Sequence, residues 1–168
     1  MASLVGLAGW LAASPLTTAA TPLVTARAWI VPALQVVHIV GIAVVVIATA
    51  LINLRTLGLI DADRPQRQVQ AVWFPVLACA IVVLALTGYL LIASEPARAL
   101  FRTVFWVKLG LIVLALVVTG VQGRLARRAD VAPPTARLLA VAAGLLWVGV
   151  IFAGRWIAYA DAWPGASA

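Results

Sequence analysis

The chain has 168 residues, of which 65% are hydrophobic and 10% are charged, and its mean hydropathy is +1.12. Soluble domains carry roughly 25% charged residues, so this composition excludes a soluble globular protein and indicates one that lies in a lipid bilayer. The formal net charge is +7. Because no basic run is interleaved with aromatic residues, we interpret the arginines as topology signals and expect no nucleic-acid partner.

Several classes of chemistry are disfavoured by the residue counts. The chain has one cysteine and one histidine, which cannot form an intramolecular disulfide or a closed structural zinc site, and one methionine, which argues against a copper relay. No phosphate-binding loop, nucleophile elbow or carboxylate pair is present. We therefore expect that the protein has no catalytic activity of its own.

The first element in chain order is a short apolar segment over residues 1–15. Leu4, Leu7, Trp10 and Leu11 recur at helical spacing before Pro15, which predicts a helix lying in the membrane interface. A frayed apolar tail is the alternative. No Lys or Arg precedes the apolar run, unlike in a secretory signal, so we expect the segment to remain in the mature protein.

Four later stretches, residues 29–51, 72–94, 101–121 and 137–159, are long and apolar enough to be transmembrane helices. About 20 helical residues cross a hydrocarbon core of about 30 Å. The connections between them are short and carry turn and charge signals, so neighbouring helices should be antiparallel. The sequence thus predicts an all-α membrane four-helix bundle, compact and preceded by a short amino-terminal interfacial helix, in a single domain spanning residues 1–168.

Basic residues predict the orientation in the membrane. Seven of the twelve lie in two of the connections: Arg55, Arg64, Arg67, Arg124, Arg127, Arg128 and Arg137. Cytoplasmic loops are enriched in such residues, so both connections should be cytoplasmic. Ring side chains typical of a headgroup boundary gather on the other side: Trp10, Trp29, Trp106, Trp156, Tyr159 and Trp163. We expect a bacterial inner-membrane protein with both termini in the periplasm.

Ionisable residues are costly within a bilayer and often functional there, so His38, Lys108 and Arg155 are the positions to consider. At 1.5 Å per helical residue, His38 lies roughly 14 Å inside Trp29, and Lys108 lies roughly 10 Å inside Phe101. Arg155 lies roughly 6 Å from the end of the last span. All three belong to the outer leaflet in this topology, and we expect a bundle to bring them together in one polar site.

Three helices carry stripes at three-four spacing that should face the bundle interior. On the first span the stripe is Gln35, His38, Ile42, Val45, Thr49 and Asn53. On the third it is Lys108, Ile112, Ala115, Thr119 and Gln122, and on the fourth Gly144, Val148, Ile151 and Arg155. All five acidic residues lie in loops or beyond helix ends, which disfavours a transporter with a buried carboxylate relay.

The pieces W-I-V-P-A-L-Q-V-V-H-I-V-G, L-R-T-L-G, F-R-T-V-F-W-V-K and G-R-W-I-A-Y resemble a bacterial family of small membrane proteins of unknown function. The resemblance covers nearly the whole chain, including the amino-terminal segment that ends in A-S-P-L, and it implies a four-helix integral membrane protein. The matching positions are His38, Gly41, Arg55, Gly58, Arg102, Lys108, Gly154 and Arg155. The resemblance implies no established activity.

One histidine with two cations suits a b-type haem. His38 would be the metal ligand, Lys108 and Arg155 would pair with the propionates, and Gln35, one turn before His38, could orient the ring. The chain has no second histidine for the sixth iron position, so a His38 from a second copy of the chain, a five-coordinate iron or no haem are the choices.

Other interpretations stay open at this point. The cations could bind an anion, a quinone or a lipid headgroup in a binding or transport module. They could also reach the headgroups without a further role, and His38 could be a packed, hydrogen-bonded side chain. A non-catalytic accessory subunit is a third class. The bilayer is the expected partner, and a homo-oligomer or a periplasmic or membrane protein partner is compatible with each class.

Overall fold

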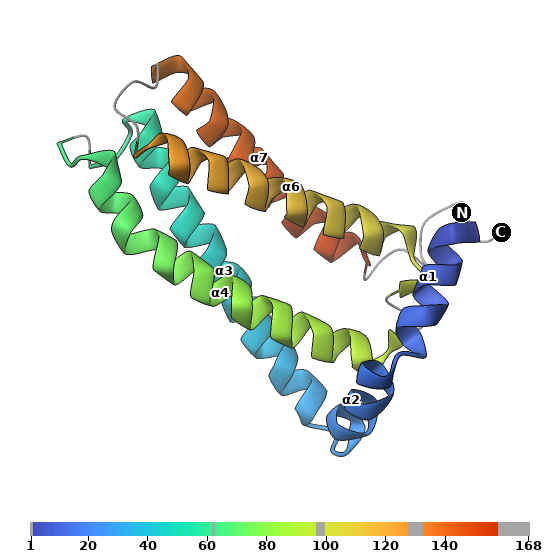
Figure 1. The fold of residues 1–168 in the computed structure, drawn as a ribbon. Coiled ribbons are helices and arrows are strands. Elements are labelled where there is room, and N and C mark those ends of the chain that lie inside the picture. The colour runs from blue at the N-terminus through green and yellow to red at the C-terminus, as the bar shows by residue number, and fades with distance from the viewer. Residues whose placement is uncertain (1, 62, 97–99, 128–132, 158–168) are drawn as a thin grey trace.

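A computed structural model describes residues 2–61, 63–96, 100–127 and 133–157. These residues form helices and no strand (Figure 1), which confirms the all-α class. The helices are α1 (Ala2–Ala12), α2 (Pro15–Thr25), α3 (Ile30–Leu57), α4 (Gln66–Ser94), α6 (Thr103–Leu125) and α7 (Pro133–Ile157). Of the residues named above, Arg128, Tyr159 and Trp163 lie outside the described residues.

Four helices, α3, α4, α6 and α7, are long and apolar enough to cross a membrane. Their outer faces carry large apolar side chains such as Ile39, Val82 and Leu145, which are 64%, 58% and 68% exposed. Such surfaces would be unfavourable in water but match the acyl chains of a bilayer. The chain is therefore a multi-pass membrane protein.

Two of the helices extend further than hydropathy predicts. Helix α3 continues to Leu57 rather than residue 51, and α4 begins at Gln66 rather than residue 72. The additional turns contain polar residues such as Asn53 and Gln70, which are buried between helices instead of facing lipid. Helical structure thus continues past the apolar part of each span.

Helix α1 lies within residues 1–15, where the sequence predicts a helix, and a second helix, α2, follows it. The second helix, α2, begins because Ser14 accepts a hydrogen bond from the Thr17 amide at 3.3 Å and Pro15 occupies the first turn. Thr21 Oγ1 lies 2.8 Å from Thr17 O and 2.8 Å from Ala93 O, so it links α2 to the end of α4. The position of α1 in the membrane interface stays a prediction.

The membrane helices form two antiparallel hairpins, α3–α4 and α6–α7, and α3 packs against α7 to join them. The hairpins meet at the end where α3 and α6 end and α4 and α7 begin, which we call the loop end, and diverge toward the other end, the open end (Figure 1). Helices α1 and α2 lie at the open end. The membrane helical bundle is thus confirmed, but the buried core around Val45, Ala48, Ala115 and Trp147 joins the hairpins over only part of their length.

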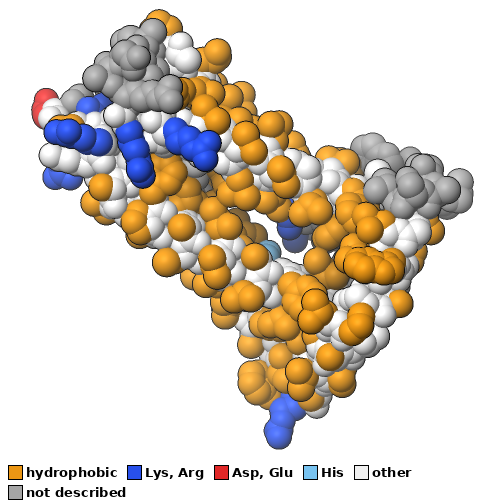
Figure 2. All heavy atoms as spheres, viewed as in Figure 1, with side chains coloured by type: hydrophobic (Ala, Val, Ile, Leu, Met, Phe, Trp, Pro, Cys, Tyr) orange, Lys and Arg blue, Asp and Glu red, His pale blue; other side chains and the backbone are white. Residues whose placement is uncertain are grey.

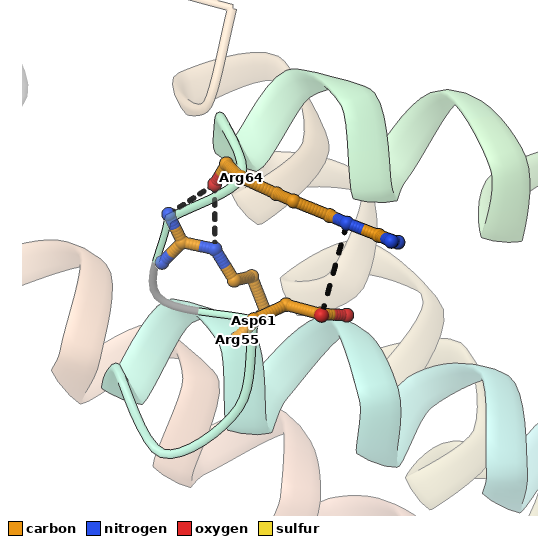
Figure 3. A network of polar contacts seen from close by, with 3 residues as sticks. All are labelled: Arg55, Asp61 and Arg64. Atoms are coloured by element: carbon orange, nitrogen blue, oxygen red, sulfur yellow. Dashed lines mark hydrogen bonds and ion pairs between the residues drawn. The ribbon is translucent and has the colours of Figure 1, made fainter.

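The L-R-T-L-G motif ends α3 and fixes the connection that follows. Gly58 adopts a left-handed conformation with φ of 79°, and its amide donates to Arg55 O at 3.0 Å. The Arg55 guanidinium in turn donates to Arg64 O from Nε at 2.8 Å and from a terminal nitrogen, while Asp61 and Arg64 pair at 3.8 Å (Figure 3). The motif therefore has a structural role in closing the loop.

The predicted inward stripes differ in their outcome. Those of α3 and α6 are buried at Val45, Thr49 and Asn53 and at Ala115, Thr119 and Gln122. On α7 the prediction was wrong, since Val148 and Ile151 are 48% and 41% exposed. The buried face of α7 instead contains Ala140, Ala143 and Trp147, and Trp147 Nε1 donates to Thr119 Oγ1 at 3.2 Å. This hydrogen bond holds Trp147 against α6 of the same hairpin, and Trp147 also belongs to the buried core that includes Val45 and Ala48 of α3.

Candidate functional site

His38 lies on α3 with its ring against α4. Its Nδ1 is 2.8 Å from Thr87 Oγ1, and the Thr87 hydroxyl is 2.7 Å from Val83 O, one turn earlier on α4. A hydroxyl has one proton, so a Thr87 that donates to Val83 O must accept from His38 Nδ1–H. The tautomer assigned in this way leaves a lone pair on Nε2, which has no hydrogen-bond partner among the described residues.

Gly88 leaves room for the His38 ring beside α4. A Cβ added at residue 88 would lie 3.3 Å from His38 Cε1, closer than most such contacts. The adjacent residues Thr87 and Gly88 therefore act together, one by binding Nδ1 and the other by leaving space for the ring edge. His38 is half-buried in this position.

Lys108 extends from α6 toward Gly154 on α7. A Cβ added at Gly154 would lie 3.4 Å from Lys108 Nζ and 3.5 Å from Cε. The ammonium is close enough to His38 to interact with it electrostatically. Among the described residues, no acidic side chain forms an ion pair with Lys108.

A hollow separates the hairpins on the side where they diverge. Figure 2 shows the histidine and a Lys or Arg side chain inside this hollow, with hydrophobic side chains around it. We call it the inter-hairpin hollow and define it by His38 on α3 and Lys108 on α6. A basic group and a metal-binding nitrogen are thus presented together in largely apolar surroundings.

The structure brings together only part of the predicted site. His38 and Lys108 lie near each other, whereas Arg155, in the last turn of α7 and next to Gly154, is exposed. Gln35 is also exposed, and the oxygen that accepts the hydrogen bond of the His38 ring belongs to Thr87. Sequence reasoning missed Thr87.

No group of three or more His, Cys, Asp or Glu side chains that could hold a bare metal ion occurs in the described part of the chain. A site with one imidazole can still bind a metal when the ligand supplies the remaining donor atoms, as a porphyrin does with its four nitrogens.

Comparison with family models identifies the chain at the level of its family. A model of a family of unknown function, DUF6644, matches residues 28–160. The chain belongs to the DUF6644 family. The match includes α3, α4, α6 and α7 but not α1 and α2, so it confirms the resemblance to an uncharacterised family and corrects its extent at the amino terminus. No curated protein and no solved structure matches the chain.

Proposed function

We propose that this DUF6644 protein is a b-type haem-binding electron-transfer subunit, with haem held in the inter-hairpin hollow. The observation that carries the proposal is that His38 Nε2 and Lys108 Nζ are presented to one hollow without a hydrogen-bond or ion-pair partner among the described residues. A single ligand can bind both groups if it carries a metal for the imidazole and a carboxylate for the ammonium. Haem b has this combination.

The surroundings of His38 fit an axial ligand. Histidines that bind metals usually donate their other ring nitrogen to an oxygen, which sets the tautomer and the ring orientation, and Thr87 provides that oxygen at 2.8 Å. The hollow has apolar walls suited to a porphyrin face (Figure 2). Lys108 would pair with a propionate, and Arg155, one residue after Gly154, would contribute charge at the rim.

The sixth iron position has no histidine in this chain, which contains one in total. A five-coordinate iron or a His38 supplied by a second copy are the two arrangements that the proposal includes. The low-spin spectrum of a bis-histidine haem would distinguish the dimer from the five-coordinate form.

The proposed location of the haem is the outer leaflet of a bacterial inner membrane. Lys and Arg side chains gather at the loop end of the molecule (Figure 2), and loops enriched in them tend to stay in the cytoplasm. The open end and its hollow would then face the periplasm, where a periplasmic or membrane protein could exchange electrons with the haem.

The absorption spectrum of the detergent-purified protein from haem-replete cells tests the proposal. We expect a Soret band that is lost in His38→Ala and weakened in Lys108→Ala, because the second change removes a propionate partner but no iron ligand. Thr49→Val is a matched control, since Thr49 is buried on the same helix and its hydroxyl bonds within that helix. A folded, colourless wild-type protein would reject haem, and a band that survives His38→Ala would reject the ligand.

A second candidate is binding of a quinone or an organic anion at the same hollow. It is favoured by the unpaired Lys108 ammonium, which could donate to a carbonyl or carboxylate oxygen, and by the absence of a second histidine from the chain. Here His38 Nε2 would accept a hydrogen bond from the ligand. Quinone that copurifies with a colourless wild-type protein but not with Lys108→Ala would support this candidate instead.

A further inference from the structure

A second polar cavity lies at the loop end, away from His38. Its volume is about 230 Å³, many times the roughly 10–15 Å³ that a single water needs. Apolar residues from the end of α6 and from α7 form one part of its wall. The polar part comes from α3, α4 and α6 and consists of Arg55, Thr56, Gln66, Gln70 and Gln122. We call it the loop-end cavity.

Thr56 determines how two of the glutamines are oriented. Its hydroxyl donates to Ile52 O at 2.8 Å and accepts from Gln66 Nε2 at 2.6 Å and from Gln122 Nε2 at 3.1 Å. Both amide nitrogens are therefore directed at Thr56. With the Thr56 proton donated to Ile52 O, a flipped amide would place its oxygen against a hydroxyl oxygen that has no proton to offer, so we assign both nitrogens to Thr56.

The opposite ends of these amides are left without partners. Gln66 Oε1, Gln122 Oε1 and Gln70 Nε2 are buried and make no hydrogen bond with any described residue. Gln122 and Gln70 are only 3% and 5% exposed. Buried polar atoms are nearly always paired, so three unpaired atoms around one cavity indicate a missing polar occupant.

The unpaired atoms and the charge define the chemistry of that occupant. Two amide oxygens require hydrogen-bond donors, and the Gln70 amide requires an acceptor. Arg55 adds positive charge to the wall, and the loop end is rich in basic side chains (Figure 2). The occupant should therefore be an anion that also carries at least two donors.

We propose that the loop-end cavity binds a phosphate that carries hydroxyl groups, as in a glycerol phosphate. The hydroxyls donate to Gln66 Oε1 and Gln122 Oε1, and a phosphate oxygen accepts from Gln70 Nε2 beside the Arg55 charge. This chemistry has two sources, the headgroup of phosphatidylglycerol and free glycerol phosphate. The site is independent of the hollow around His38 and does not require haem.

Thermal unfolding of the full-length protein in neutral detergent tests the proposal, because a ligand that binds the folded state raises the unfolding temperature. The probes are short-chain phosphatidylglycerol and glycerol 1-phosphate, with short-chain phosphatidylcholine, glycerol and inorganic phosphate as comparisons. We expect phosphatidylglycerol, glycerol 1-phosphate or both to raise the unfolding temperature more than the comparisons do. A shift with the lipid alone assigns the headgroup, and a shift with the free compound assigns a soluble ligand.

The variants Gln70→Met and Gln122→Met remove the amide groups while keeping side-chain length. Each should weaken the apparent affinity at least about tenfold, and Gln68→Met, an exposed glutamine on the same helix, should leave it unchanged. If Gln122→Met does not fold, the affinity of Gln70→Met alone tests the proposed site. The proposal is overturned when no probe exceeds the comparisons, or when Gln70→Met binds as tightly as Gln68→Met.

Discussion

At the scale of single residues, the two membrane-embedded polar groups each lie against a glycine of a neighbouring helix. His38 contacts the position of Gly88, and Lys108 contacts that of Gly154. A glycine leaves room for a polar side chain to lie along the helix surface instead of being pushed toward lipid. These two contacts explain why His38 and Lys108 stay within the inter-hairpin hollow.

Replacing Thr87 with valine tests the role assigned to its hydroxyl. Valine has nearly the same shape but cannot accept the proton of His38 Nδ1, so the ring loses its fixed orientation. We expect haem retention to fall about 10- to 100-fold, as is typical when the partner of a ligating histidine is removed. The ratio of haem to protein after size-exclusion chromatography is the measurement. Retention equal to that of Thr49→Val would show that Thr87 does not orient the ligand.

The sequence identified His38 and Lys108 but not their partners. Ionisable residues in an apolar span are conspicuous because burying them is costly. Thr87 is not, since a threonine in a membrane helix usually bonds its own backbone, and Thr87 does so with Val83 as well. Its contact with His38 depends on the packing of α3 against α4, which one sequence does not specify.

At the scale of helices, small residues decide how closely the hairpins approach. The tightest position is Gly123 on α6, where an added Cβ would lie 2.6 Å from Cζ of the Phe74 ring on α4. Gly120, one turn earlier, has open space around it. Because lipid removes most of the hydrophobic driving force, contacts of this kind contribute much of the packing energy between membrane helices.

Gly123→Ala should destabilise the protein, because the new methyl group displaces a rigid ring. We expect a loss of about 1–3 kcal/mol in the free energy of unfolding, typical of overpacking. Gly120→Ala should be neutral or stabilise by up to about 1 kcal/mol, since alanine favours the helix. Reversible unfolding in mixed micelles measures both. Equal stabilities of the two variants would contradict the close α4–α6 contact.

The end of α3 gives a second test at this scale. Gly58 has φ of 79°, a conformation that costs a residue with a Cβ about 1–2 kcal/mol. Gly58→Ala should lower the free energy of unfolding by about that amount, and Gly58→Asn by less, because asparagine tolerates this conformation. The same unfolding assay compares them, and an alanine variant as stable as wild type would show that the turn has another conformation.

Hydropathy predicted the four membrane helices. The residue pattern predicted the buried faces of α3 and α6 but not that of α7. The stripes of α3 and α6 contain polar residues such as Asn53 and Gln122, which mark the inward side. Helix α7 has apolar side chains on all faces, so Val148 and Ile151 could not be distinguished from the buried Ala143 and Trp147. The loop-end glutamines were missed for a related reason, because Gln66 and Gln70 precede the predicted start of their span.

At the scale of the whole molecule, the two ends differ in both charge and packing. The loop end carries most of the Lys and Arg side chains visible in Figure 2, whereas the open end carries α1, α2 and the exposed Trp29. A molecule polarised in this way should insert with the loop end in the cytoplasm.

Fusions to the carboxyl terminus test that orientation. Alkaline phosphatase attached after Ala168 should be active, because it folds only in the periplasm, and a fluorescent protein that folds only in the cytoplasm should stay dark at the same position. Fusions within the 58–65 connection should give the reverse pattern and serve as the internal control. A bright fusion after Ala168 would mean that the inter-hairpin hollow faces the cytoplasm.

The separation of the hairpins also affects how a ligand reaches His38. The hollow lies between helices whose outer surfaces face acyl chains, so a lipophilic molecule can enter sideways from the membrane. Its occupancy then depends on the concentration of that molecule within the bilayer, set by its partition coefficient, rather than on its concentration in water. A ligand too insoluble to measure in buffer could therefore saturate the protein, and exchange between neighbouring proteins could take place by lateral diffusion in two dimensions.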